Sequence, residues 1–360
     1  MDSTRDGQQV NVQQAGTLVP PSPTSTSDRR HPSGWVPQHK GLMSVTTKID
    51  LQAVVAPILI SILLLVVGQF VNPGFASLQN IGNLLAIAAI LAIGAAGQTV
   101  VVISGGGGID MSLGAMMSLG AVLASGLLNG SDSRILLTLV VLLALGALFG
   151  LANGAGIWFM KIPPLVMTLA IASVVDGFTL FVGRGRPYGS PSPFILAIGG
   201  GRIFVFLRWL VVIAAVFVLL FTFLLNRTRY GKKLFLMGNN RTAAELNGIH
   251  VRNVLLITYV LAGMMYTLAG LFLLSAVGTA QMQMGTQYTL LSVAAVVLGG
   301  TQLTGGKGTY LGTALGSIVL VTLSSVLITI GMASGVRLII TGIVLVGILA
   351  VYSRQPKLRQ

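Results

Sequence analysis

The 360-residue sequence predicts an all-α integral membrane protein with about ten transmembrane helices. Three observations predict this fold class: 54% of the residues are hydrophobic, only 8% are charged, and apolar runs of helical length recur along most of the chain. A soluble domain carries about 25% charged residues and could not bury so much apolar surface. Long runs rich in small residues are typical of membrane helices rather than barrel strands.

Ten apolar runs account for most of the chain, six before a long basic segment and four after it. They cover residues 51–71, 81–103, 112–129, 135–159, 165–183, 204–225, 254–277, 286–301, 309–331 and 335–352. Asp176 and Gly177 are expected to interrupt the fifth run, and the Gly- and Pro-rich stretch 184–202 is expected to lack regular structure. Residues 51–353 are therefore predicted to form one transmembrane domain with some helices broken at Gly-rich segments.

The two ends of the chain differ in composition from this domain. Residues 1–50 are rich in Ser, Thr, Pro and Gln, and such a stretch cannot bury enough apolar area to offset its ordering entropy. We predict a disordered cytoplasmic tail there, and no signal peptide, since no apolar run lies near Met1. Residues 354–360 are predicted to form a basic cytoplasmic tail.

The net charge of +14 comes from basic residues that lie mostly between apolar runs. This distribution fits lipid headgroups and topology determination, so we expect no nucleic-acid partner. The segment 226–253 holds six basic residues and one acid, which predicts a cytoplasmic loop and, with six spans before it and four after it, two cytoplasmic termini. Four arginines conflict with this orientation, because they would lie in or beside an external loop: Arg184, Arg186, Arg202 and Arg208.

Metal and thiol chemistry are not expected. The chain has no cysteine, which excludes disulfides, thiolate metal sites and cysteine nucleophiles. Its three histidines, His31, His39 and His250, lie outside the apolar runs, so no buried histidine metal centre is predicted. We expect neither a metal nor a cofactor.

Asp110 is the first candidate functional residue. It follows four glycines at the end of the second run and precedes Ser112. Consecutive glycines break a helix, and broken backbone at membrane depth is tolerated only where it is buried in protein or lines a cavity. An acid at such a break marks Asp110, Gly107, Gly108 and Ser112 as candidate pathway residues. The alternative is a turn at the membrane surface in which Asp110 caps the next helix.

Asp176 is the second candidate, since a charge within an apolar run is costly. It either lines a pathway or pairs with Arg184 or Arg186. The Gly-rich stretch 299–308 lacks the spacing of a phosphate-binding loop, and it predicts a tight turn between closely packed helices.

A short helix is predicted within the basic segment. Thr242 would cap it, and Gly248 would end it after Ala243, Ala244, Glu245 and Leu246. A short surface helix of this kind can be gripped by a soluble partner protein. A linker that serves only topology is the alternative.

Four blocks in order resemble a known family. They are Q-T-V-V-V-I-S-G-G-G-G-I-D-M-S-L-G-A (98–115), N-G-A-G-I-W-F-M-K-I-P-P-L-V-M-T-L-A (153–170), A-A-E-L-N-G-I (243–249) and V-A-A-V-V-L-G-G-T-Q-L-T-G-G-K-G-T-Y-L-G-T-A-L-G (293–316). Together they resemble the permease subunit of ribose/xylose/galactose-type ABC sugar importers, in the superfamily of binding-protein-dependent sugar and branched-chain amino acid permeases. The sequence departs from the family pattern in two extra glycines before Ile109, in Asp176–Gly177 for Arg-Gly and in Ser324–Ser325 for Asn-Gly.

The resemblance implies a type II ABC importer-like fold in a bacterial inner membrane. It implies a monosaccharide substrate, an extracytoplasmic sugar-binding protein, a second permease copy or close paralogue, and a cytoplasmic ATPase that performs the hydrolysis, so that the chain itself is no enzyme. It adds Thr99 to the candidate pathway residues. It assigns ATPase coupling to the region of Arg241, Ala243, Ala244, Glu245 and Gly248.

Three alternatives remain from the sequence. The first is a permease for another small polar solute, such as a branched-chain amino acid. The second is a stand-alone secondary transporter, for which Asp110 and Asp176 would be the only buried acids. The third is a membrane enzyme, which lacks any obvious catalytic constellation.

Overall fold

A computed structural model describes residues 51–353 except residues 187, 205 and 206. The two predicted tails, 1–50 and 354–360, lie outside the described residues. The described part of the chain is built of helices and loops, with one isolated β-bridge between Arg202 and Arg208. The predicted all-α fold class is confirmed.

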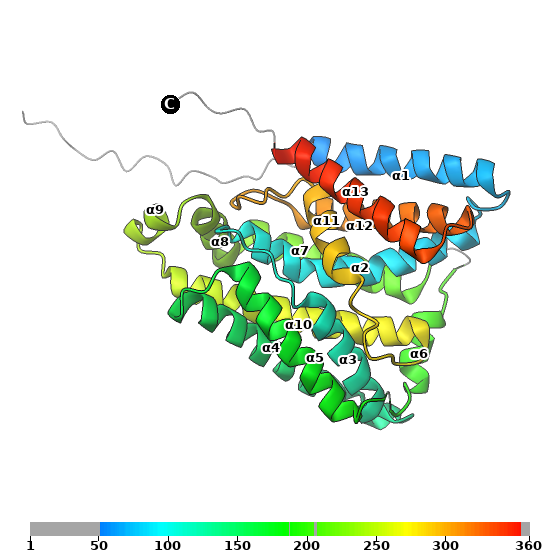
Figure 1. Ribbon diagram of the computed structural model, residues 1–360, viewed down its shortest axis with the longest axis horizontal. Coiled ribbons are helices and arrows are strands. Elements are labelled where there is room, and N and C mark those ends of the chain that lie inside the picture. Colours follow the sequence, from blue (N-terminus) through cyan, green and yellow to red (C-terminus); the bar gives the residue numbers. More distant parts are fainter. Residues whose placement is uncertain (1–50, 187, 205–206, 354–360) are drawn as a thin grey trace, which may run out of the picture. The chain divides into compact units, whose positions relative to one another are not determined.

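The helices follow one another along the chain as shown in Figure 1. A one-turn 3₁₀ helix, η1, lies between α3 and α4. The elements are α1 Leu51–Val71, α2 Leu78–Ile103, α3 Leu113–Leu128, η1 Asp132–Arg134, α4 Ile135–Phe159, α5 Pro164–Gly183, α6 Pro193–Gly200, α7 Trp209–Arg227, α8 Arg229–Asn239, α9 Arg241–Leu246, α10 Val251–Val277, α11 Tyr288–Leu298, α12 Tyr310–Thr329 and α13 Ser334–Ser353.

Each of the ten predicted apolar runs corresponds to a helix. Among the described residues, seven helices are long and apolar enough to cross a membrane, namely α1, α2, α4, α5, α7, α10 and α12. The helices α3 and α11 and the described part of α13 contribute shorter apolar stretches. The two shortest, α3 and α11, each follow a non-helical segment, and both segments matter for the site below.

Two local predictions were wrong. Helix α5 is continuous through Asp176 and Gly177, because a single glycine costs a helix only about 1 kcal/mol when its neighbours are strong helix formers. The stretch 184–202 contains α6, which begins at Pro193. A proline at the first helical position loses no hydrogen bond, since that N–H has no partner within the helix.

Helices α2 and α10 form the core of the bundle. In the most apolar 18-residue stretch of each helix, 94% of the residues of α2 and 67% of those of α10 are buried. In α1, α4, α5 and α7 the buried share is only 11–22%. Small residues permit this close packing: a Cβ on Gly146 of α4 would lie 2.5 Å from the carbonyl oxygen of Gly263 on α10. The outer helices present their remaining apolar surface to the bilayer.

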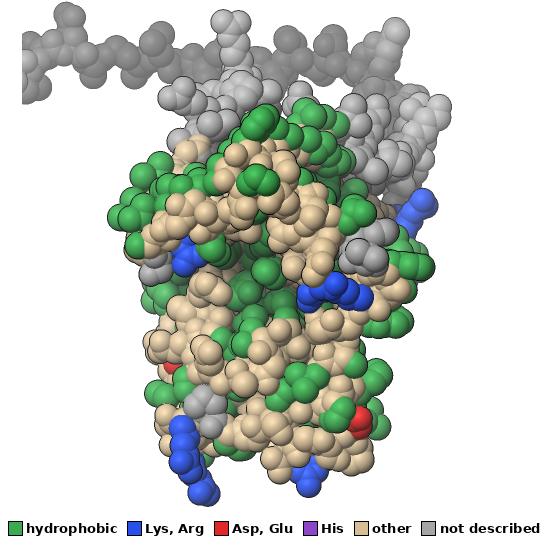
Figure 2. Space-filling model, turned by 90° about the vertical axis from the view of Figure 1, so that its right-hand side faces the viewer, with side chains coloured by type: hydrophobic (Ala, Val, Ile, Leu, Met, Phe, Trp, Pro, Cys, Tyr) green, Lys and Arg blue, Asp and Glu red, His purple; other side chains and the backbone are tan. Residues whose placement is uncertain are grey.

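The helices run between two ends of the bundle, which we name by the short helices found there. The α8–α9 end and the α6 end lie at opposite sides in Figure 1. Helix α2 runs to the α8–α9 end, and the chain then turns back through 104–112 into α3, whose far end joins the 184–192 loop through the Gly130 N–H and the Ser190 carbonyl. Viewed from the α6 end, the surface is hollowed near its middle, and hydrophobic side chains line the hollow (Figure 2).

Candidate functional site

The glycine run after α2 breaks the helix, as predicted. Gly105, Gly106 and Gly107 all have positive φ angles, of 74°, 67° and 73°. Three successive left-handed residues are accessible to glycine at little cost, whereas each non-glycine residue there would cost about 1–2 kcal/mol. This reversal lets the chain turn back into the bundle after Ile103.

Asp110 is buried inside the bundle, with 1% of its surface exposed. Its Oδ1 accepts hydrogen bonds from the backbone N–H of Ser112 (2.9 Å) and from the Ser112 hydroxyl (2.6 Å). The Tyr266 hydroxyl on α10 is a further hydrogen-bond partner of the carboxyl group. Asp110 is therefore enclosed by the bundle, and its carboxylate binds Ser112, which is itself the N-cap residue of α3.

Long-range contacts tie this break to the surrounding helices. The Gln98 amide on α2, in the orientation that satisfies both its atoms, pairs with the backbone of Asp110 at 3.0 and 3.1 Å. Asn153 on α4 donates to the Ser112 hydroxyl (3.0 Å), and the Met111 N–H donates to the Thr168 hydroxyl on α5 (3.0 Å). We name this group the Asp110 cluster: Gln98, Asp110, Ser112, Asn153, Thr168 and Tyr266.

The sequence analysis missed four members of the Asp110 cluster: Gln98, Asn153, Thr168 and Tyr266. The available signal was the presence of the amide side chains of Gln98 and Asn153 within otherwise apolar runs. Asn153 also carries a buried Oδ1 with no hydrogen-bond partner among the described residues. Polar groups of this kind are expensive at membrane depth, so each calls for a partner or a role.

The other predicted pathway residues occupy different places. Thr99 faces α12, where its hydroxyl donates to the hydroxyl of Thr313 (2.9 Å). Gly108 is buried, and a Cβ there would lie 2.6 Å from the Val101 carbonyl oxygen, whereas Gly107 is exposed with open space beside it. The structure thus brings Asp110 and Ser112 into one cluster and leaves Thr99 and Gly107 outside it.

Asp176 lies on α5, apart from the hydrogen bonds of the Asp110 cluster. Its side chain is half-buried, and the adjacent Gly177 is exposed with no atom within 4 Å of a Cβ position. Among the residues that the structure describes, Asp176 forms no ion pair with Arg184 or Arg186. The pairing alternative is therefore absent from this arrangement, and the carboxylate lies near the outer surface of an apolar helix.

At the α8–α9 end, three chain segments meet through four glycines, which we name the glycine junction: Gly105, Gly238, Gly305 and Gly306. The N–H of Gly306 donates to the carbonyl of Ile103 (2.9 Å), and Asn239 donates to the carbonyl of Gly306 (3.3 Å). Arg241 of α9 donates to the carbonyl of Gly105 (3.4 Å). The junction therefore links α9 directly to the break that holds Asp110.

Helix α8 is fixed to the bundle by Tyr230. Its hydroxyl is hydrogen-bonded to that of Thr258 on α10, at 2.8 Å. Burial raises the pKa of Tyr230 well above its ordinary value, so the phenol stays protonated and the bond persists at any physiological pH.

The predicted tight turn at 299–308 is also confirmed, since Gly299 and Gly312 bring α11 and α12 into backbone contact.

Helix α9 forms where the sequence predicts it, with a different cap. Asn240, and not Thr242, is the N-cap residue: its side chain accepts from the N–H of Ala243 at 3.0 Å. Asparagine ranks above threonine as a cap, and the geometry selects it here. Gly248 has a positive φ of 74° and follows the end of the helix, as predicted.

The two faces of α9 differ sharply. Ala244 is buried against the bundle, while Ala243, Glu245 and Gly248 are exposed. Leu246, which the sequence analysis did not single out for function, is 85% exposed. The exposed face of α9 therefore presents one large apolar side chain at the end of the helix.

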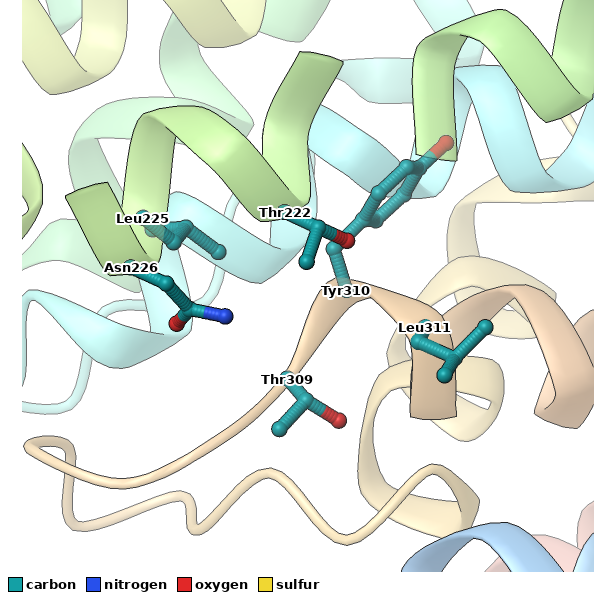
Figure 3. A pocket seen from close by; sticks show the side chains of 6 residues that line it. All are labelled: Thr222, Leu225, Asn226, Thr309, Tyr310 and Leu311. Carbon is teal, nitrogen blue, oxygen red and sulfur yellow. The ribbon is translucent and has the colours of Figure 1, made fainter. Parts of the chain in front are cut away.

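A small cavity lies between α7 and the start of α12 (Figure 3). Its lining residues are Thr222, Leu225, Asn226, Thr309, Tyr310 and Leu311. Its volume of about 40 Å³ is far below the roughly 300 Å³ of small-molecule sites. It has room for water, and it is too small for a sugar-sized ligand.

Gly238→Ala is expected to destabilise the protein by about 1–3 kcal/mol, the usual cost of overpacking. A Cβ at Gly238 would overlap the Ile103 carbonyl and lie 2.5 Å from the Gly306 nitrogen. Thermal unfolding of the purified variant in detergent measures the effect. Gly177→Ala is the matched control, because that helical position is open. Equal melting temperatures for the two variants would contradict the close contact.

Comparisons with known proteins identify the family. The profile described as "Branched-chain amino acid transport system / permease component" matches residues 80–349. The ribose import permease protein RbsC of Escherichia coli (strain K12) is 30% identical over 308 residues, covering 80% of this chain and 90% of the relative. RbsC of Bacillus subtilis (strain 168) is 34% identical over 292 residues, covering 80% and 89%.

A relative named as a galactose import permease matches the chain to a similar extent. The galactose/methyl galactoside import permease protein MglC of Escherichia coli (strain K12) is 31% identical over 309 residues, covering 79% of this chain and 89% of the relative. No solved structure matches the chain. With three quarters of its length matched by the profile and most of each relative covered, this membrane protein belongs to the family of branched-chain amino acid transport system permease components.

Proposed function

We propose that this chain is the transmembrane permease subunit of an ATP-binding-cassette importer and that it forms the translocation pathway for a monosaccharide. The observation that carries the proposal is the continuous connection from an exposed surface helix, α9, through Arg241 and the glycine junction to a buried polar helix break. A transporter needs such a connection between its energy source and its pathway. The relatives named as ribose and galactose import permeases support the sugar substrate.

The energy source is a cytoplasmic ATPase that docks on α9. The exposed residues Ala243, Glu245, Leu246 and Gly248 form its contact surface, while Arg241 carries the movement inward. Because the ATPase hydrolyses ATP, the permease itself performs no chemistry. No cofactor or metal is required for this role.

The pathway follows the polar groups within the bundle and on its outer surface. Asp110 and Ser112, with Gly107, Gly108 and Thr99, shape its inner wall. Asp176 lies near the outer surface of α5, where a carboxylate facing lipid would be costly. A second permease copy, or a close paralogue, packed against this surface would enclose it, and an extracytoplasmic binding protein would deliver the sugar to the pathway.

The protein lies in a bacterial inner membrane with its α8–α9 end toward the cytoplasm. Both termini lie on the cytoplasmic side of that membrane. The six basic residues of 226–253 support this orientation. The competing arginines at the α6 end include Arg208, whose guanidinium donates to the Asn83 side chain (2.6 Å) and to the Gly199 carbonyl (3.4 Å). An arginine engaged within the protein bears less on topology than a free one.

Reconstituted uptake tests the function. The permease, its ATPase and its binding protein are placed in liposomes and offered radiolabelled ribose, xylose, galactose and leucine. We expect ATP-dependent uptake of at least one sugar and none without the ATPase. Uptake of leucine alone would favour the second candidate, an amino acid permease, to which the family profile points. Uptake driven by an ion gradient without ATP would overturn the proposal.

A further inference from the structure

The chain between α10 and α11 is not helical. Gly278, with a positive φ of 80°, ends α10, and α11 begins only at Tyr288. The intervening residues 279–287, T-A-Q-M-Q-M-G-T-Q, contain three glutamines and no charged residue. We name residues 279–287 the glutamine segment.

The glutamine segment lies deep within the bundle. The N–H of Gly285 donates to the hydroxyl of Ser118 on α3 (3.0 Å). At the start of α11, the Thr289 hydroxyl accepts from the N–H of Gly114 (3.1 Å). Ser118 is ten residues before Leu128, which places it about 15 Å along the helix from the α6 end. The segment thus enters from the α6 end to roughly the middle of a bilayer.

The polar side chains of the segment face outward. Gln281, Gln283, Thr286 and Gln287 are exposed, whereas Gly285 is buried against α3. None of these four side chains has a hydrogen-bond partner in the described part of the chain. Non-helical backbone and unpaired amides at this depth do not face lipid; they line a water-filled path or are covered by protein.

The segment also adjoins α5. A Cβ on Gly183 would lie 2.5 Å from Cε of Met282, so the methionine packs against the α6-end portion of that helix. Asp176 lies two turns away on the same helix. The exposed amides and the α5 carboxylate therefore belong to neighbouring elements.

The chemistry of the segment matches a polyhydroxyl solute. Each glutamine amide offers two donors and one acceptor, and each sugar hydroxyl both donates and accepts. Three uncharged amides on a short backbone can hydrogen-bond adjacent hydroxyls without demanding a charged substrate. We infer that the glutamine segment contacts the sugar during passage and contributes to selection among sugars. This inference rests on the proposed function and adds the residues that contact the substrate.

Thiol labelling tests the position of the segment, because the chain contains no cysteine to remove. In the reconstituted complex, Gln283→Cys and Gln287→Cys are expected to react with a charged, membrane-impermeant methanethiosulfonate. Leu219→Cys, at an exposed apolar position of α7, is the control and should not react, since thiols in lipid do not ionise. If both glutamine-segment cysteines are as unreactive as Leu219→Cys, the segment does not line an aqueous path and the inference is overturned.

Uptake kinetics test recognition. The double variant Gln283→Leu/Gln287→Leu keeps a similar side-chain volume but loses the amides. We expect at least a tenfold lower kcat/KM for the transported sugar. The preference between ribose and galactose should also change. Assembly of the complex and its yield after reconstitution should be unchanged. Gln79→Leu, at an exposed position in the first turn of α2, is the matched control. Wild-type kinetics in the double variant would overturn this inference alone, whereas absence of sugar uptake by the wild-type complex would overturn the proposed function with it.

Discussion

Leu246→Asp is expected to reduce co-purification of the ATPase with the permease about tenfold or more and to abolish ATP-driven uptake. Leu246 is 85% exposed at the tip of α9, so the substitution leaves the interior of the permease intact. In a docked complex the leucine would fill an apolar groove of the ATPase, where a carboxylate would be buried without a partner. Affinity capture of the complex followed by quantification of both subunits measures the loss.

Phe204→Asp is the control for Leu246→Asp. Phe204 is 62% exposed at the α6 end, so this variant introduces the same carboxylate at the opposite end of the bundle. ATPase recovery should equal that of the wild type. If Phe204→Asp lowers recovery and Leu246→Asp does not, the proposed orientation is wrong. Ala244 is unsuitable for this test, since it is buried and a charge there would disturb folding as well as docking.

Asp110→Ala is expected to destabilise the permease by about 2–6 kcal/mol. The substitution leaves the N–H and hydroxyl of Ser112 without their acceptor inside the bundle, and each unsatisfied buried group costs about 1–3 kcal/mol. A fall in melting temperature of about 5–15 °C in detergent would follow. Glu245→Ala, on the exposed face of α9, is the control and should change the melting temperature little.

Asp110→Asn separates folding from transport. Asparagine keeps a carbonyl oxygen to accept from Ser112, so assembly with the partner subunits should be preserved. The substitution removes the negative charge to which the Tyr266 hydroxyl is hydrogen-bonded, and this weakens the contact between the break and α10. We expect reduced uptake at normal complex yield. Wild-type uptake by Asp110→Asn would exclude a role in transport, and an unchanged melting temperature for Asp110→Ala would exclude the structural role.

Properties that depend on local chemistry were predictable. Hydropathy reports which solvent a segment requires, so the ten runs and the membrane class followed from residue type alone. The helix break at Gly105–Gly107 followed equally, because three successive positive φ angles demand residues without a Cβ. The end of α9 at Gly248 is a third case of the same kind.

Predictions from local chemistry were wrong where two alternatives differed little in free energy. Gly177 did not break α5, because one glycine is a small penalty in a long apolar helix. Asn240 was preferred to Thr242 as a cap, and this choice changes the start of α9 by two residues. Such errors concern a few residues, and they leave the order of elements unchanged.

Contacts between distant segments required the tertiary structure. Asp110 could have lain at a membrane surface, and only its neighbours Gln98, Asn153 and Tyr266, from three other helices, place it inside the bundle. The same holds for the glutamine segment, whose depth follows from the hydrogen bonds of Gly285 and of Thr289, at the start of α11, to residues of α3 some 170 positions earlier. The sequence by itself determined that the chain resides in a membrane and where its helices break, because hydropathy and backbone freedom are properties of each residue type. Which polar groups meet depends on helix packing, and packing is a property of pairs of surfaces that no single segment contains.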